Sequence, residues 1–240
     1  CTDEVTYVCI LKACSIMGSL EIGMDINAEV RNNGLLEKYF VLGNALVEMY
    51  SKCGELKKAR AVFEGIPIRD VVSWNAVIAG YGQFGQAYMV LDLYNRMKTE
   101  DVMPDIVTFI ALLNACGHAG LVKEGEKLFD EMRAKYCLFP TQEHYTCMID
   151  LFGRAGQFDK VNALLDNVPH SGHLPLLRSI LAACRKWRNV KLGKWAFEQV
   201  LQSDEKNAAA YVSMSNIYAS AGLQMEVGRI QDLRVVNKAR

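Results

Sequence analysis

The feature that most constrains this chain is a motif that returns every 31 to 36 residues along most of its length. Each copy has two or three apolar residues, a small or polar pair, a glycine, and then a second run with helical periodicity. The last interval between marker glycines is 66 residues, which fits two steps if Asn189 replaces a glycine, since Asn tolerates left-handed backbone. Repeats of this length are typical of solenoids and arrays. The marker glycines are Gly18, Gly54, Gly85, Gly120, Gly156 and Gly222.

Each copy predicts a helix, a tight turn and a second helix. The glycine ends the first helix by adopting positive φ. The second run places apolar residues at helical spacing, as in Val90, Leu93, Tyr94 and Met97. All five prolines fall near junctions between copies, where a helix must stop. A helical pair can bury its apolar face only against its neighbours, so we predict an all-α fold, an α-solenoid superhelix of helix-turn-helix repeats with a concave face.

Composition excludes several classes of protein. The chain is 51% hydrophobic and 22% charged, which argues against disorder. Its 27 basic and 27 acidic residues cancel, so binding to nucleic acid would rest on a local stripe of charge. None of the eight cysteines forms a C-x-x-C pair, which disfavours a zinc ribbon or redox motif and fits a reducing compartment. The apolar stretches are shorter than the roughly 18 to 20 residues of a membrane span, so we expect no membrane partner.

One segment carries a specific family resemblance. VVSWNAVIAGYGQFGQ from Val71, continuing through LDLYNRM to VMPD, resembles the pentatricopeptide repeat motif. The alternating copy lengths resemble the PLS subclass, which mixes standard, long and short motifs. The resemblance implies an array over residues 1–173 and paired E motifs at 174–207 and 208–240. Within the array it implies long motifs at 4–39 and 106–141, short motifs at 40–70 and 142–173, and a standard motif at 71–105.

The resemblance also implies that the chain binds single-stranded RNA, with one base contacted per repeat by two or three side chains. In the family these are the fifth and last residues of a motif, with a wedge between bases near the second position. The implied base-reading pairs are Val8 with Tyr39, Asn44 with Asp70, Asn75 with Asp105, Ile110 with Thr141, and Thr146 with His173. The implied wedges are Val5, Val41, Val72 and Val107, and the expected phosphate contacts are Lys52, Arg154 and Lys186.

The chemistry of these residues fits that reading. An Asn amide donates and accepts, so it can meet the Watson–Crick edge of a pyrimidine, whereas an ionised Asp only accepts. Asn with Asp resembles a uridine code in the family and occurs twice in succession, so we expect adjacent U-U opposite residues 40–70 and 71–105. Ile110 and Val8 cannot hydrogen-bond a base and predict permissive units, while Thr146 resembles a purine-leaning choice.

Structural roles compete with these functional ones. Asp70 and Asp105 precede predicted helices and are ordinary N-cap candidates. Trp74 is expected in the core rather than stacked on a base. Three further residues, Cys14, Cys116 and Cys184, recur at one motif position and are expected to pack in the core as small hydrophobes.

The resemblance implies a specificity factor for C-to-U RNA editing in a chloroplast or mitochondrion. Its partners would be RNA, organelle editing cofactor proteins and a deaminase acting in cis or in trans. No histidine is followed two residues later by Glu, so the zinc deaminase signature is missing and we predict no enzymatic activity and no cofactor. Two alternatives stay open. One is splicing or stabilisation of an organelle RNA. The other is a tetratricopeptide-like protein scaffold, which neutral charge favours and the tandem Asn/Asp pairs disfavour.

Overall fold

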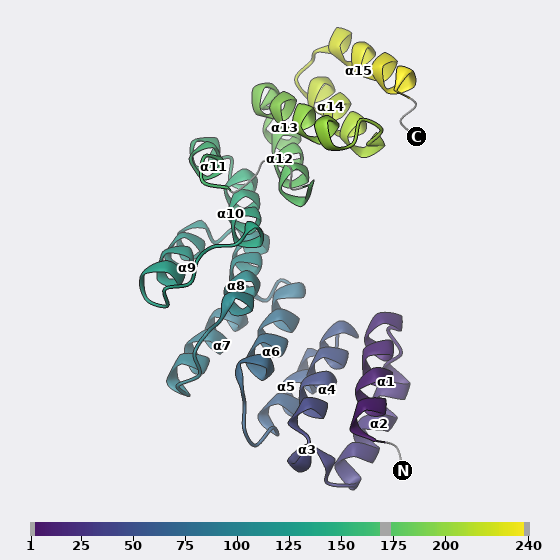
Figure 1. Cartoon of the computed structure of the whole chain (residues 1–240), viewed down its shortest axis with the longest axis vertical. Coiled ribbons are helices and arrows are strands. Elements are labelled where there is room, and N and C mark those ends of the chain that lie inside the picture. The colour runs from purple at the N-terminus through teal and green to yellow at the C-terminus, as the bar shows by residue number, and fades with distance from the viewer. Residues whose placement is uncertain (1–2, 169–173, 238–240) are drawn as a thin grey trace. The chain divides into compact units, whose positions relative to one another are not determined.

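A computed structural model describes residues 3–168 and 174–237, and over these residues every regular element is a helix (Figure 1). This confirms the predicted all-α solenoid fold. The helices are α1 (Glu4–Met17), α2 (Leu20–Asn32), α3 (Leu35–Lys38), α4 (Phe40–Lys52), α5 (Leu56–Glu64), α6 (Val71–Gln83), α7 (Ala87–Thr99), α8 (Ile106–Ala119), α9 (Val122–Ala134), α10 (Gln142–Arg154), α11 (Phe158–Leu165), α12 (Leu174–Trp187), α13 (Val190–Ser203), α14 (Ala208–Ser220) and α15 (Gln224–Val236).

The chain forms two compact units, Cys1–Ala119 and Gly120–Arg240. In the first unit α1, α4, α6 and α8 pack one on the next and form a row of inner helices, while α2, α5 and α7 each pack on their inner partner. In the second unit α10, α12 and α14 form the inner row, with α11, α13 and α15 as outer partners. Each helical pair therefore buries its apolar face against neighbouring pairs, as expected for a solenoid.

The inner helices begin at Glu4, Phe40, Val71, Ile106, Gln142, Leu174 and Ala208. The bounds predicted for the seven motifs stay a prediction. Aspartates cap α1 and α6, where Asp3 and Asp70 accept a hydrogen bond from the backbone N–H three residues on. The division of the motifs into long, short, standard and E types stays a prediction.

The turn after each inner helix contains a residue with a left-handed backbone conformation, that is, positive φ. The six marker glycines all have positive φ. Gly156 needs the missing side chain for a second reason, because an added Cβ would lie 2.9 Å from the ring of Trp187. At the remaining turn the prediction for Asn189 is wrong: Arg188 has φ 57°, and Asn189 instead caps α13 by accepting from the Leu192 N–H at 3.1 Å. The left-handed position was therefore predicted one residue too far along the chain. Asn189 acts as the N-cap of α13, a position that Asn favours strongly.

The core holds the residues that were expected there. Trp74 is fully buried and packs edge-on against Phe63, with ring centroids 4.8 Å apart. Cys14, Cys116 and Cys184 are buried as well, which confirms their packing role.

Successive inner helices meet through a recurring pair of small residues. The twelfth residue of one helix faces the tenth residue of the next. The pairs are Ser51 with Gly80, Gly82 with Ala115, and Gly153 with Ala183. A Cβ added at Gly80 or Gly153 would lie 2.7 Å from the partner's Cβ, whereas one added at Gly82 would lie 3.7 Å from that of Ala115. Each contact thus has one side chain and one glycine, which lets the helices approach closely.

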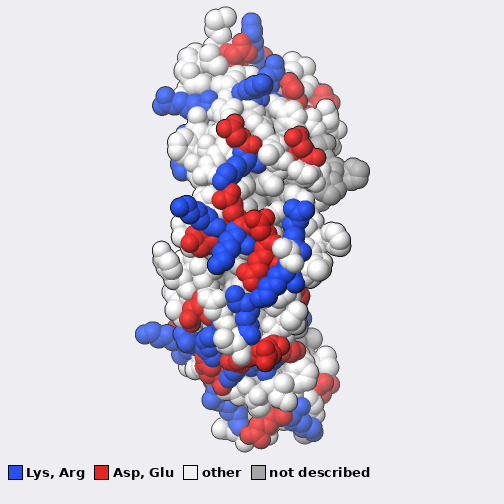
Figure 2. Space-filling model, turned by 90° about the vertical axis from the view of Figure 1, so that its left-hand side faces the viewer, with Lys and Arg blue, Asp and Glu red and all other residues white. Residues whose placement is uncertain are grey.

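Charges on the outer helices are paired rather than segregated. Glu64 at the end of α5 contacts Arg96 of α7 at 2.7 Å, and Arg69, which precedes α6, contacts Glu100, which follows α7, at 2.9 Å. The hydrogen bond from Arg96 is the main cause of the lowered pKa of Glu64. Figure 2 likewise shows acidic and basic side chains interspersed on the face drawn. Within the described residues, no helix is long and apolar enough to cross a membrane.

Candidate nucleic-acid interface

Asn75 and Asp105, predicted as one base-reading pair, are joined directly in the structure. The Asn75 amide nitrogen donates to Asp105 Oδ1 at 3.0 Å, from α6 to the residue that precedes α8. The same carboxylate oxygen accepts the Thr108 N–H at 2.9 Å, so Asp105 also caps α8. The Thr108 hydroxyl donates to Asn75 Oδ1 at 2.6 Å. Asp105 therefore caps α8 and bonds Asn75 with the same oxygen, while its base-reading role stays a prediction.

The preceding predicted pair, Asn44 and Asp70, has a different arrangement. Asp70 accepts the Ser73 N–H at 2.9 Å and the Ser73 hydroxyl at 2.8 Å. Burial raises the pKa of the Asp70 carboxyl, but the hydrogen bonds from Ser73 and from Asn44 outweigh it and lower that pKa. The Asn44 amide oxygen is buried and has no hydrogen-bond partner. The Asn44 amide oxygen thus lacks the hydrogen bond that the Asn75 oxygen accepts from Thr108.

A groove on the inner helices brings several predicted residues together. Residues of α4, α6 and α8 line a concavity of about 290 Å³ that contains Asn75, Val72, Val107 and Lys52. Val72 and Val107 are each 54% exposed, although both are apolar. Two exposed aliphatic side chains beside a polar amide form a setting in which a flat base could stack and be hydrogen-bonded. Other lining residues are Glu48, Ser51, Ala76, Ala79, Gly80 and Gln83.

The other predicted base-reading and wedge residues of the first unit are described by their exposure. In the first unit Val8, Tyr39 and Ile110 are partly exposed, and the wedge residues Val5 and Val41 are exposed. Ile110 and Thr141 belong to different units. His173 lies outside the described residues.

Two of these residues in the second unit have local hydrogen bonds. The Thr146 hydroxyl donates to the Gln142 carbonyl oxygen at 2.8 Å within α10. Thr141 and His144 form a capping box at the start of the same helix, in which the Thr141 N–H donates to His144 Nδ1 at 3.1 Å. Both threonines therefore have structural partners in the absence of a ligand, and their base-reading roles stay predictions.

The three expected phosphate contacts differ in their surroundings. Lys52 is exposed and lines the groove. Arg154 pairs with Asp150 at 2.6 Å, and Lys186 donates to the carbonyl oxygen of Arg154 at 3.0 Å. Lys52 shares this cavity with Asn75, a predicted base-reading residue, and the phosphate contacts of all three stay predictions.

Sequence reasoning missed the hydroxyl residues Ser73 and Thr108. Each lies three residues after an Asp of a predicted pair and hydrogen-bonds to it. The signal was present as D-x-x-S and D-x-x-T, a pattern typical of helix N-termini. The contact of Thr108 with Asn75, 33 positions away, could not be found from that pattern.

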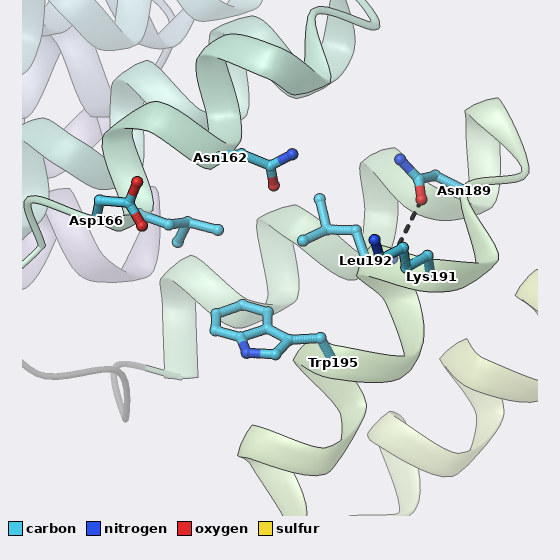
Figure 3. A pocket seen from close by; sticks show the side chains of 7 residues that line it. Asn162, Asp166, Asn189, Lys191, Leu192 and Trp195 are labelled. Atoms are coloured by element: carbon cyan, nitrogen blue, oxygen red, sulfur yellow. Dashed lines mark hydrogen bonds between the residues drawn. The ribbon is translucent and has the colours of Figure 1, made fainter.

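The second unit has a pocket of another kind, shown in Figure 3. It measures about 510 Å³ and lies between the outer helices α11 and α13. Trp195 and Leu192 supply an apolar surface, with Asn162 and Asp166 facing them (Figure 3). The remaining lining residues are Leu165, Asn189 and Lys191. None of the residues predicted to contact RNA lines this pocket. Among the described residues, no group of His, Cys, Asp or Glu side chains is arranged to hold a metal ion.

Comparison with known families assigns the repeats. The PPR repeat family matches residues 69–118, the PPR repeat matches residues 44–70, 107–137 and 143–173, and the E motif matches residues 187–235. The matched segments are repeat modules and not catalytic domains.

Relatives agree with this assignment. A putative pentatricopeptide repeat-containing protein of Arabidopsis thaliana, named as mitochondrial, is 37% identical over 96% of this chain and 37% of its own length. A second from the same plant is 36% identical over 100% of this chain and 34% of its own length. The chain therefore spans about a third of the length of these curated relatives.

Solved structures show the same fold. The pentatricopeptide repeat protein PPR10 in complex with an 18-nt psaJ RNA element has a TM-score of 0.74 and 16% identity, over 98% of this chain and 35% of that one. PPR10 from maize has a TM-score of 0.62, also at 16% identity, over 97% of this chain and 39% of that one. The chain belongs to the pentatricopeptide repeat family, and its E motif assigns it to the E subgroup of the PLS class.

Proposed function

We propose that this chain binds single-stranded RNA in the groove of its inner helices, with one base per repeat and a preference for adjacent uridines. The observation that carries the proposal is the groove of the first unit. There Asn75, hydrogen-bonded to Asp105, lies in one concavity with the exposed Val72 and Val107 and with Lys52. This set combines a hydrogen-bonding edge, two stacking surfaces and one cation.

The charge distribution supports weak binding that depends on base contacts. The chain has no net charge, and Glu48 lines the groove together with Lys52. Since phosphate neutralisation supplies most non-specific affinity, little of it is available here. A well-made base contact discriminates by about 1–3 kcal/mol, so two uridine-selective units would supply a measurable preference.

For the biological role, we propose a specificity factor for C-to-U editing of organelle RNA. The E motif and the PLS class support this role, and some relatives are named as mitochondrial. The partners would then include organelle editing cofactor proteins and a deaminase acting in cis or in trans. Splicing or stabilisation of an organelle RNA uses the same RNA-binding groove, so it is an alternative outcome of the same recognition.

The proposal is tested by fluorescence anisotropy at fixed salt, with a short RNA that carries U-U in register and a matched RNA that carries A-A. Wild type is compared with Asn75→Thr. Asn167→Thr serves as the matched control, because Asn167 is an exposed residue that follows α11 and does not line the groove.

We expect wild type and the Asn167→Thr control to prefer U-U, and Asn75→Thr to lose or shift the preference at one position. Equal binding of both RNAs by all three proteins would contradict base reading. Absence of RNA binding at low salt would instead favour a protein scaffold.

A further inference from the structure

The two Asn/Asp pairs of the first unit are identical in sequence but differ in how the structure holds their amides. Asn75 is 8% exposed and both ends of its amide are bonded, the nitrogen to Asp105 and the oxygen to Thr108. The Asn44 side chain contributes to the lowered pKa of Asp70, but its amide oxygen is buried without a hydrogen-bond partner. A repeat code that considers only the Asn and the Asp predicts the same base preference for these two units. The hydrogen bonds of the two amides, however, differ.

The donors and acceptors around Asn75 determine which end of its amide is the nitrogen and which is the oxygen. An ionised carboxylate only accepts, so the Asn75 nitrogen must face Asp105. The Thr108 oxygen accepts the Asp105 N–H at 3.1 Å, and its single proton has two acceptors within reach. Asn75 Oδ1 lies at 2.6 Å and Asp105 Oδ1 at 3.0 Å. Donation to the nearer oxygen avoids two unprotonated oxygens in close contact, and rotating the amide by 180° would break both of its bonds.

The residue that corresponds to Thr108 in the preceding unit is Ser73. Both are fully buried, and the backbone N–H of each donates to the carboxylate three residues before it. The Ser73 hydroxyl, however, contacts Asp70 and not the Asn44 oxygen. The β-branch of threonine restricts rotation about χ1, whereas the serine hydroxyl can turn away. One methyl group therefore distinguishes an amide whose nitrogen and oxygen are both hydrogen-bonded from one whose oxygen has no partner.

We propose that Thr108 is a positioning residue that fixes the Asn75 amide, so that residues 71–105 discriminate uracil from cytosine more sharply than residues 40–70. Uracil and cytosine exchange a donor for an acceptor at two positions of the Watson–Crick edge. An amide fixed at both ends can match only one of these edges, whereas an amide whose oxygen has no partner is held less firmly in that polarity. This inference rests on the proposed RNA-binding function and adds a third residue that sets the specificity of each unit.

The test compares three RNAs by anisotropy with the full chain: U-U, C-U and U-C, with the first base opposite residues 40–70 and the second opposite residues 71–105. We expect the U-over-C ratio at the second position to exceed that at the first by about fivefold or more, the lower range for one base contact. Thr108→Val, which replaces the hydroxyl by a methyl, should reduce the ratio at the second position to within about twofold of the first.

Two further variants separate positioning from folding. Ser73→Thr should raise the ratio at the first position, a gain that misfolding does not produce. Thr108→Ser keeps the hydroxyl that accepts the Asp105 N–H, and should lower the ratio at the second position while preserving the fold. Loss of a helix cap weakens binding of every RNA alike, so it leaves the ratio unchanged. Solvent exchange of the Asn75 side-chain amide protons, measured by NMR, should be slower than that of Asn44 and should increase in Thr108→Val.

The outcomes distinguish this inference from the proposed function. Equal ratios at both positions, unchanged by the three variants, would refute the role of Thr108 even where Asn75→Thr alters base preference. RNA binding that is absent, or that is indifferent to Asn75, would refute the proposed function, and the role of Thr108 would fail with it.

Discussion

Gly153 and Gly82 occupy the same position in their helices, so replacing each by Ala tests the packing between inner helices. Both are buried, and each faces the tenth residue of the next helix. An Ala Cβ at position 153 would lie 2.7 Å from that of Ala183, whereas at position 82 it would lie 3.7 Å from that of Ala115, an ordinary contact. Gly→Ala adds about 1 kcal/mol of helix propensity in both cases. Overpacking costs about 1–3 kcal/mol and applies only at position 153.

Gly82→Ala should therefore stabilise the chain by up to about 1 kcal/mol, and Gly153→Ala should be about 1–3 kcal/mol less stable than Gly82→Ala. Thermal unfolding followed by circular dichroism measures the difference, at roughly 2–4 °C per kcal/mol for a chain of this size. Adding Ala183→Gly to Gly153→Ala moves the methyl across the contact, so the double variant should show a coupling of about 1 kcal/mol or more. Equal midpoints for the two single variants, or purely additive effects in the double variant, would refute the small-residue contact.

Three further predictions concern charge, protonation and thiol chemistry. Glu48→Gln should strengthen RNA binding by about 0.5–1 kcal/mol, roughly two- to fivefold, because a carboxylate in the groove repels phosphate. RNA titrations at two salt concentrations measure this change in affinity. An unchanged affinity would mean that the RNA binds elsewhere on the chain. The Asp70 carboxyl has a pKa below its usual 3.8, so its ionised form contributes stability above pH 3.8 that is lost as the pH falls through the lower folded value. Asp70→Asn should thus lower the unfolding midpoint at neutral pH, with a deficit that shrinks in acid, and a deficit independent of pH would contradict this. Burial raises the pKa of the Cys147 and Cys184 thiols to about 12, so iodoacetamide should label the exposed Cys9 and Cys137 first, as peptide mass spectrometry can show; equal labelling of all four would contradict the packing.

The sequence predicted the features that depend on local pattern. Val71 and Ile106 begin helices because an Asp before each can cap it, and Trp74 is buried because it lies on the apolar side of α6. The left-handed residue of one turn is Arg188, one position before the predicted Asn189. Asn suits both a left-handed position and an N-cap, and periodicity alone does not separate these roles.

Contacts between repeats could not be predicted in the same way. The clamp of Thr108 on Asn75 joins residues 33 positions apart, and it depends on the spacing between α6 and α8. That spacing is set in turn by small residues such as Gly82 and Ala115, whose importance appears only when the helices are packed together. Lys186 likewise contacts the Arg154 carbonyl rather than standing free toward solvent, because α12 packs on α10.

The most direct test of the central claim is selection of bound RNAs from a random pool, with sequencing of the recovered fraction. The account predicts enrichment of two adjacent uridines by the wild-type chain. It also predicts that Asn44→Thr changes the preferred base at the first of these positions and Asn75→Thr at the second. Recovery of no motif, or of one motif that is the same for all three proteins, would contradict base recognition by successive repeats.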